Sequence, residues 1–204
     1  MLNIRQFRSD DLDTLYKISL ATGLAGGDAS HLYVDPRLMG HIYAAPYALL
    51  EPALALVVED GEGVAGFAVG TADTTAWERR LEQLWWPSLR KRYAMPEGTD
   101  ASLWTHDQRR AFTIHRPALV PLAVALQYPA HVHMNLLPRL QRRGAGTKLF
   151  ERWATAASAQ DAKAIHVAIN RANVGAAGFW RKMGFAEVAL DGLPEGRTLW
   201  MGKA

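Results

Sequence analysis

The spacing of apolar residues in the first third of the chain predicts short strands alternating with short amphipathic helices. After the first strand, Ser9 is a favourable N-cap, and Leu12, Leu15 and Ile18 form an apolar stripe with helical spacing. Gly61-Glu62-Gly63 joins two apolar runs tightly enough to predict an antiparallel hairpin. The predicted elements are a strand at 2–7, a helix from Ser9 to about Thr22, a glycine-rich loop at 23–28, a helical stretch at 29–45 interrupted near Pro36, and strands at 53–60 and 64–70.

A long segment then separates the hairpin from the next clear strand. Its length, roughly 55 residues, is unusual for a connection and predicts inserted structure. Thr74 to Tyr93 has the pattern of one amphipathic helix with Trp77, Leu81, Leu84 and Trp85 on its apolar side, and Trp104 to His115 predicts another. These tryptophans are either the core of the inserted helices or the lining of a pocket.

The last third alternates regularly between strand and helix. The predicted elements are a strand at 131–137, a helix at 144–159, a strand at 164–169, a helix at 173–183, and strands at 185–190 and 197–201. This order predicts an α/β domain with a right-handed crossover. We expect one domain over residues 1–204, with a helical segment inserted at about 74–127.

Composition excludes several classes of protein. Hydrophobic residues make up 49% and charged residues 21%, an ordinary soluble mixture. The absence of cysteine excludes disulfides, thiolate metal sites and a cysteine nucleophile. The net charge of +3 is spread over several segments, which does not favour nucleic-acid binding. With no signal-peptide pattern at the start and no long apolar run, we expect a cytoplasmic protein without a membrane partner.

The turn between the strand at 131–137 and the helix at 144–159 has the features of an anion site. Gly144 and Gly146 lack the β-carbons that would keep a phosphate away from the free N–H groups of the helix start, and Arg142 and Arg143 add charge. A Walker loop would need Lys-Ser/Thr after Gly146, where Thr147-Lys148 stands. A dinucleotide-binding loop would need glycine at 149, where leucine stands. The alternative is that both glycines only permit tight helix packing.

Two motifs resemble those of a known superfamily. Gln141-x-x-Gly144-x-Gly146, which follows a strand and Pro138, resembles the Q/R-x-x-G-x-G/A motif of the GNAT acetyltransferases. The segment from Asn173 to Phe185 is similar to their second signature, an Asn-x-x-Ala helix ending in an aromatic pair and Gly-Phe. The resemblance implies an α/β GNAT fold: a mixed central sheet splayed at the cofactor strand, helices on both faces, and here a helical insertion before that strand.

Three further segments resemble one branch of that superfamily. They are Gly27-Asp28-Ala29, the stretch 40–47 and the stretch 129–133. The branch comprises bacterial proteins akin to the C-terminal acetyltransferase-like domain of animal O-GlcNAcase, and it includes domains whose transferase activity is in doubt.

The resemblance implies acetyl-CoA as co-substrate and no metal. The backbone N–H of Leu136 would face the thioester oxygen as an oxyanion donor. The implied cofactor-binding residues are Asn135, Leu136 and Leu137 for the pantetheine arm, Gln141, Arg142, Arg143, Gly144, Ala145, Gly146 and Thr147 for the pyrophosphate, Asn173, Ala176, Phe179 and Trp180 beside the pantetheine, and Arg181 or Lys182 for the adenosine phosphates.

The acid and base are not where the resemblance would put them. Ala130 occupies the position at which several GNAT enzymes carry a glutamate base. His133 and His131 share one strand face with Asn135 and are the candidate bases, the alternative being that they are hydrogen-bonded structural groups. Trp180 stands where many of these enzymes have a proton-donating tyrosine, and an indole N–H cannot deliver a proton. The candidate replacements are Tyr33, Tyr43 and Tyr128.

The sequence therefore supports two functions. The first is an N-acetyltransferase that moves acetyl from acetyl-CoA to a primary amine by direct attack. The second is a non-catalytic module that only binds acetyl-CoA. The acceptor, a small amine or a peptide, stays unassigned, and the oligomeric state stays open, with a homodimer among the alternatives.

Overall fold

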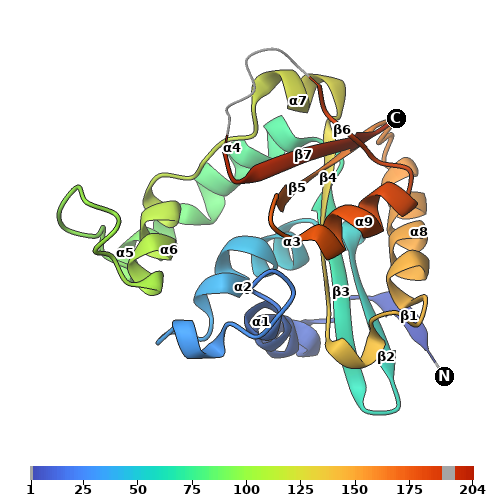
Figure 1. Cartoon of the computed structure of the whole chain (residues 1–204), viewed down its shortest axis with the longest axis horizontal. Coiled ribbons are helices and arrows are strands. Elements are labelled where there is room, and N and C mark those ends of the chain that lie inside the picture. Colours follow the sequence, from blue (N-terminus) through green and yellow to red (C-terminus); the bar gives the residue numbers. More distant parts are fainter. Residues whose placement is uncertain (1, 190–195) are drawn as a thin grey trace.

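The computed structural model describes residues 2–189 and 196–204, which form a mixed sheet with helices on both faces (Figure 1). The strand order is β1-β2-β3-β4-β5-β7-β6. The strands are β1 (Asn3–Gln6), β2 (Ala55–Asp60), β3 (Gly63–Thr71), β4 (Ala130–Leu136), β5 (Ile165–Asn170), β6 (Ala186–Glu187) and β7 (Thr198–Lys203). The β4–β5 pair is parallel and the other pairs are antiparallel, so the mixed sheet expected from the sequence is confirmed.

The helices divide between the two faces of this sheet. They are α1 (Leu12–Ala21), α2 (Leu38–Tyr43), α3 (Ala45–Leu50), α4 (Thr74–Leu84), α5 (Trp86–Arg92), α6 (His106–His115), α7 (Leu122–Gln127), α8 (Ala145–Ser158) and α9 (Val174–Lys182). Because successive side chains of a strand point to opposite faces, Leu56 and Val58 pack with residues of α8 and α9, while Val57 packs with residues of α1 to α6.

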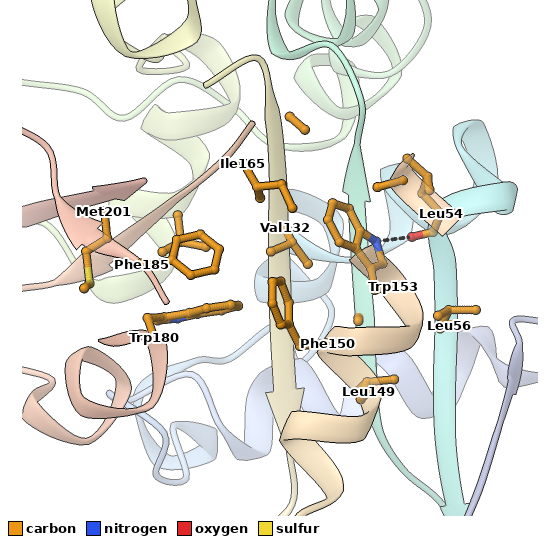
Figure 2. Close-up of a cluster of buried hydrophobic side chains, with 14 of the residues drawn as sticks. Leu54, Leu56, Val132, Leu149, Phe150, Trp153, Ile165, Trp180, Phe185 and Met201 are labelled. Carbon is orange, nitrogen blue, oxygen red and sulfur yellow. Dashed lines mark hydrogen bonds between the residues drawn. The ribbon is translucent and has the colours of Figure 1, made fainter. Parts of the chain in front are cut away.

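The core under α8 combines aliphatic side chains with large aromatic ones (Figure 2). The buried indole N–H of Trp153 donates to the carbonyl oxygen of Leu54 at 2.9 Å, which satisfies the polar atom of this side chain. Phe150, Trp180 and Phe185 pack edge to face, with ring centroids 4.9 to 5.5 Å apart. This core holds α8 against the centre of the sheet.

Several predicted boundaries were wrong for identifiable reasons. The helix expected over 74–93 divides at Trp85 into α4 and α5, because Pro87 has no N–H for the helix ladder and its ring crowds the preceding turn. The stretch at 29–45 forms a 3-10 turn, Ser30–Leu32, followed by the separate helices α2 and α3. The prediction omitted α7, which lies between two prolines and is too short to show a period. Of the strand predicted at 185–190, the ladder holds Ala186–Glu187, and residue 190 lies outside the described residues.

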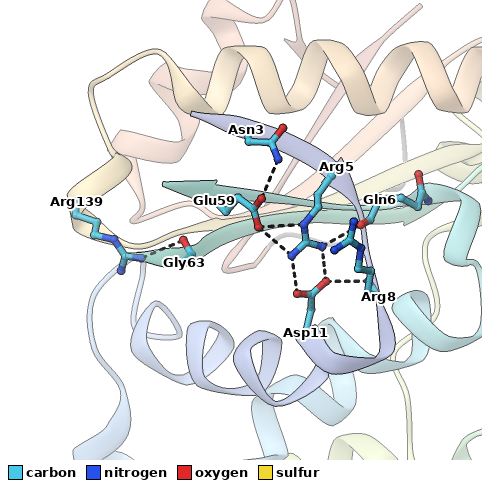
Figure 3. Close-up of polar contacts among 8 residues, drawn as sticks. All are labelled: Asn3, Arg5, Gln6, Arg8, Asp11, Glu59, Gly63 and Arg139. Carbon is cyan, nitrogen blue, oxygen red and sulfur yellow. Dashed lines mark hydrogen bonds and ion pairs between the residues drawn. The ribbon is translucent and has the colours of Figure 1, made fainter. Parts of the chain in front are cut away.

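The start of α1 depends on Asp11 and not on Ser9, the cap expected from the sequence. The Asp11 carboxylate accepts the backbone N–H of Arg8 at 2.8 Å and two N–H groups of Arg5 at 2.7 and 2.9 Å (Figure 3). Arg5 also binds Glu59 of β2. The Arg5 guanidinium lowers the pKa of Asp11 below its ordinary value. The network therefore joins α1 to the first two strands.

We expect Asp11→Asn to lower the free energy of unfolding at neutral pH by about 1–3 kcal/mol, because charge-assisted hydrogen bonds to a buried carboxylate are lost. Since folding lowers the pKa of Asp11, its stabilisation is complete above the ordinary carboxyl value of 3.8 and disappears as the pH falls through the folded-state pKa. Urea unfolding at neutral and acidic pH measures both effects. The exposed Asp10→Asn is the control, and equal stability of the two variants at neutral pH would contradict the assignment.

Candidate active site

The strands β4 and β5 separate soon after they meet. They pair only at Ala130↔Ile165 and His131↔His166, whereas β4 stays paired with β3 as far as Gly66↔Leu136. Figure 1 shows β5 and β7 running at an angle to β3 and β4. One edge of β4 is consequently free of strand partners beyond its second residue.

Alternation along β4 determines which backbone groups face this opening. The N–H of Ala130 donates to the carbonyl of Ala164 beside β5, and that of Leu137 donates to the carbonyl of Ala65 in β3. Because backbone groups point alternately to the two edges of a strand, the odd-numbered residues bond β3 and the even-numbered ones face β5. The backbone N–H groups of Met134 and Leu136 therefore point into the opening.

This register separates the three residues predicted to pair with the pantetheine arm. The backbone of Leu136 faces the opening, and its carbonyl accepts the side-chain amide of Gln141 at 2.9 Å. Asn135 and Leu137 direct their backbone groups to β3. The side chain of Asn135 lies on the α1 face and donates to Thr22 at 2.6 Å. Met134 was not predicted to face the opening, but its backbone has the orientation that we expected for Asn135 and Leu137.

The loop from Gln141 to Thr147 leads directly into α8. Gly144 caps the helix with a φ of 78°, a left-handed conformation that favours glycine. The N–H groups of Ala145, Gly146 and Thr147 begin α8, where the helix itself supplies no acceptor. The loop thus presents free N–H groups at the positive end of a helix, close to the open edge of β4.

Gly146 lies where three elements converge. A β-carbon at this position would come within 3.2 Å of both the Leu136 side chain of β4 and the Phe179 ring of α9. Gly144 has open space around it, so its glycine is explained by backbone conformation. Tight packing therefore applies to one of the two glycines, and it does not conflict with an anion site.

The charged residues of the loop differ in how firmly they are held. Arg139, just before it, pairs with Asp60, and its carbonyl accepts the Arg143 guanidinium at 3.3 Å. Arg142 and Lys148 are exposed and have no ion pair among the described residues. These cations surround the free N–H groups of the helix start.

Only part of the second motif, the segment from Asn173 to Phe185, lies beside the loop that contains Gly146. Asn173 accepts the N–H of Ala176 at 3.0 Å and so caps α9. The half-buried Phe179 faces Gly146. Trp180 is buried in the α8 core (Figure 2), and Lys182 is exposed near the end of α9. The structure thus brings Phe179 to the loop and directs the Trp180 ring into the core.

The other face of β4 carries a chain of hydrogen bonds. The Tyr47 hydroxyl of α3 lies 2.7 Å from Nε2 of His131 and 3.2 Å from Nε2 of His133. The Thr74 hydroxyl, at the start of α4, lies 2.7 Å from Nδ1 of His131 and 2.7 Å from the carbonyl of Pro129. The two predicted histidines are therefore joined by a tyrosine that the sequence analysis did not single out.

The positions of the protons follow from counting donors. Pro129 offers only a carbonyl, so Thr74 donates to it and accepts from Nδ1–H of His131. Nε2 of His131 then carries the lone pair that accepts the Tyr47 hydroxyl proton. The Tyr47 oxygen in turn accepts from Nε2–H of His133. This assignment from the network leaves the lone pair of His133 on Nδ1.

Burial keeps both imidazoles neutral. Desolvation lowers the pKa of His133 to about 4, with a smaller contribution from His166. Desolvation also places the pKa of His131 well below its ordinary value. Nδ1 of His133 has no hydrogen-bond partner among the described residues and is not fully buried. His133 therefore presents a free lone pair at neutral pH.

This lone pair belongs to a residue that lines a cavity of about 1410 Å³. Trp77, Tyr43 and Glu78 line the same cavity. Trp77 is buried and stacks on Tyr47 with ring centroids 4.4 Å apart, so this tryptophan is both core and pocket wall.

Glu78 is a carboxylate that sequence reasoning missed. Its side chain accepts the N–H of Val120 at 2.7 Å, and desolvation raises its pKa above the ordinary value. Glutamate beside an apolar stripe is common on amphipathic helices, so the sequence contained no signal for it. Thr74 and Tyr47 were equally invisible, because their partners lie more than 50 positions away in the chain.

The three candidate tyrosines are at different places. Tyr43 lines the cavity, with its ring centroid 5.9 Å from that of His133. Tyr33 accepts a hydrogen bond from Arg110. Tyr128 lies against Gly202 of β7. Of the three, Tyr43 is the one beside the candidate base.

Within residues 2–189 and 196–204, no group of three or more His, Cys, Asp or Glu side chains has the geometry of a metal site. Over the same ranges, no helix is long and apolar enough to cross a membrane.

Comparison with known proteins agrees with this geometry. Residues 107–198 match the family model described as an acetyltransferase (GNAT) domain. The chain is similar to the crystal structure of SsHAT, with 34% sequence identity and a TM-score of 0.88. The match covers 99% of this chain and 97% of that one. The structure of yncA from Salmonella typhimurium with its cofactor acetyl-CoA has a TM-score of 0.54 at 17% identity, covering 99% of this chain and 92% of that one.

A weaker similarity links the chain to a much larger protein. Protein O-GlcNAcase of Rattus norvegicus is 20% identical over 162 residues, which are 79% of this chain and 18% of that protein. The chain thus spans less than a fifth of that relative. The family model, the structural neighbours and the splayed sheet agree, and the chain belongs to the GNAT acetyltransferase superfamily.

Proposed function

We propose that this protein is an N-acetyltransferase that uses acetyl-CoA to acetylate a primary amine by direct attack, with His133 as the general base. The observation that carries the proposal is the joint placement of two features on β4. Its open edge presents the N–H groups of Met134 and Leu136, and its α1 face presents the free lone pair of His133.

The described residues fit a coenzyme A ligand. Gly146 keeps free a space that a β-carbon would fill, and the N–H groups at the start of α8 suit a pyrophosphate. Arg142 and Lys148 add positive charge, and the edge of β4 offers strand-like pairing to the pantetheine amides. When bound, acetyl-CoA supplies an activated acetyl group as a thioester.

The chain's own residues then have distinct tasks. The N–H of Leu136 donates toward the oxygen on which negative charge develops. His133 accepts a proton at Nδ1 as the attacking nitrogen becomes acidic, while its Nε2–H remains bonded to Tyr47. Tyr47, His131 and Thr74 hold the imidazole in this tautomer, so they are positioning residues.

A second candidate function is binding of acetyl-CoA without transfer. It is favoured by the position of Trp180, which is buried in the α8 core, and by Ala130, which has no side chain to act as a base. Under this alternative the cofactor groove is intact, but no residue accepts the proton. The histidine variant described below separates the two functions.

The cofactor groove is tested by Gly146→Val. We expect this change to weaken coenzyme A binding by roughly tenfold or more, because the new side chain collides with Leu136 and Phe179 and displaces the start of α8. Isothermal titration calorimetry measures the affinity. Gly178→Val on α9 is the control, since its β-carbon meets open space. Equal binding by both variants would place the coenzyme elsewhere.

The base is tested by His133→Ala. We expect kcat for acetyl transfer to fall roughly 10²- to 10⁴-fold, with unchanged affinity for acetyl-CoA. Release of free coenzyme A with a panel of amines provides the assay, and the exposed His31→Ala serves as the control. A variant as active as the wild type would remove His133 from the mechanism. No amine-dependent release by the wild type itself would leave the binding module as the function.

The pH profile gives an independent test. Because the pKa of His133 is lowered to about 4, this residue is already neutral at pH 5, and its protonation state does not change up to neutral pH. With an acceptor that stays unprotonated throughout, such as a hydrazide, we expect kcat/KM to be flat between about pH 5 and pH 7.5. An inflection near the ordinary histidine pKa of 6.5 would assign the base to a more exposed group.

A further inference from the structure

We propose that Arg110 of α6 binds the carboxylate of the acceptor, so that the substrates are amines that also carry a carboxylate, such as amino acids. This inference rests on the proposed function, because it names the substrate class of the same site. It is carried by an arginine that is partly buried, lines the cavity beside the candidate base and has no carboxylate partner in the part of the chain that the structure describes.

Arg110 differs in this respect from the other half-buried arginines. Each of the other four has a carboxylate partner: Asp11 for Arg5, Glu51 for Arg80, Glu82 for Arg90 and Asp60 for Arg139. Among the described residues, Arg110 forms no such ion pair. A partly desolvated charge without a counter-ion is costly, and a bound anion would remove that cost.

The contacts of Arg110 leave part of its guanidinium available. Its Nε donates to the Tyr33 hydroxyl and its Nη1 to the Tyr43 hydroxyl, each at 3.0 Å. Both acceptors are tyrosine hydroxyls and not carboxylates. A guanidinium has five N–H donors in one plane. The donors of Arg110 that do not bond the two tyrosines can form hydrogen bonds to both oxygens of a carboxylate.

The position of Arg110 suits a substrate that also reaches His133. The guanidinium carbon lies 5.6 Å from the centroid of the Tyr43 ring, and that centroid lies 5.9 Å from the His133 ring. All three residues line the same cavity. An acceptor held at Arg110 by its carboxylate could therefore extend past Tyr43 and place its amine at Nδ1 of His133.

The acidic residues of the cavity are already engaged by other partners. Glu82 binds Arg90 through both carboxylate oxygens. Glu78 accepts the N–H of Val120. Neither pairs with Arg110, so within residues 2–189 and 196–204 its charge lacks a carboxylate, which a bound acceptor would supply.

A purely structural role would explain Arg110 less well. The attachment of α6 to the loop that holds Tyr33 is provided by Asp107, which accepts the N–H groups of Val34 and Asp35 at 3.0 and 2.9 Å. The start of α6 is capped by Thr105 and Gln108. The helix thus has its own anchors, and the charge of Arg110 is not needed for them.

The first experiment compares matched acceptors on the wild-type protein. Amino acids of increasing chain length are each tested beside the corresponding amide, which keeps the amine and removes the charge. We expect kcat/KM for the best acid to exceed that for its amide by roughly 10- to 100-fold, the usual worth of a charge-assisted contact. Equal rates for acids and amides would overturn the inference while leaving the acetyltransferase in place.

The second experiment assigns the preference to Arg110. We expect Arg110→Gln to abolish the preference for acids over amides by raising KM for the acids alone, whereas Arg109→Gln, an exposed neighbour on α6, leaves it intact. Loss of activity toward acids and amides alike would indicate a structural role and contradict the inference. The wild-type comparison keeps the inference testable if Arg110→Gln does not fold.

Binding without turnover separates this inference from the proposed function. Calorimetry on the protein saturated with coenzyme A, which carries no acetyl group, measures the affinity for the same acids and amides. Acid-selective binding that is lost in Arg110→Gln, with no transfer to any acceptor, would support the carboxylate site and reject the transferase. If neither acids nor amides bind or react, the inference fails.

Discussion

The separation of β4 from β5 is the constraint on which the rest of the site depends. The two strands pair at only two positions, while β3 keeps β4 extended to Leu136. An edge with unpaired N–H groups is normally a liability in a folded protein. Here it ends beside the helix start that follows Gly144, so strand and helix present their free donors to one region. A ligand with amides and phosphates in series, as coenzyme A has, would satisfy both sets of donors together.

The hydrogen-bonded side chains on the α1 face of β4 are stabilised in a different way from the open edge. Burying two imidazoles, a phenol and a hydroxyl is tolerable only when each finds a partner, and Pro129, Thr74, His131, Tyr47 and His133 form one directed series. Burial also lowers the pKa of both histidines, and the lower pKa keeps their imidazoles uncharged at neutral pH. A base with a low pKa is unprotonated, and therefore able to accept a proton, in nearly every molecule at neutral pH. Its weaker affinity for the proton matters less once bond formation has made the attacking nitrogen acidic.

Local patterns in the sequence marked the loop before α8 but not the side chains that line the cavity. The Gln141-x-x-Gly144-x-Gly146 motif and the strand–helix alternation are local, so spacing predicted an α/β domain and an anion-binding loop, and the resemblance to GNAT proteins implied the splayed mixed sheet. The backbone direction of Asn135 and Leu137 was missed, because the register with β3 decides it and the spacing does not. Tyr47, Thr74 and Arg110 act through partners more than 50 positions distant, and no local pattern marks such residues. Trp180 was expected beside the cofactor, but the aromatic side chains of α8 draw its ring into the core.

The two halves of the candidate site meet at β4. The loop and α8 belong to the last third of the chain. Helices α3, α4 and α6, which precede β4 in the chain, contribute Tyr47, Thr74 and Arg110. Side chains of odd-numbered residues in β4 face those helices, and backbone groups of even-numbered residues face the open edge. Because a slip of one residue would exchange the two orientations, a single register places His133 toward the cavity and the N–H of Leu136 toward the open edge. The inserted helices can therefore change the acceptor pocket without disturbing the cofactor groove, provided that the pairing of β3 with β4 is kept.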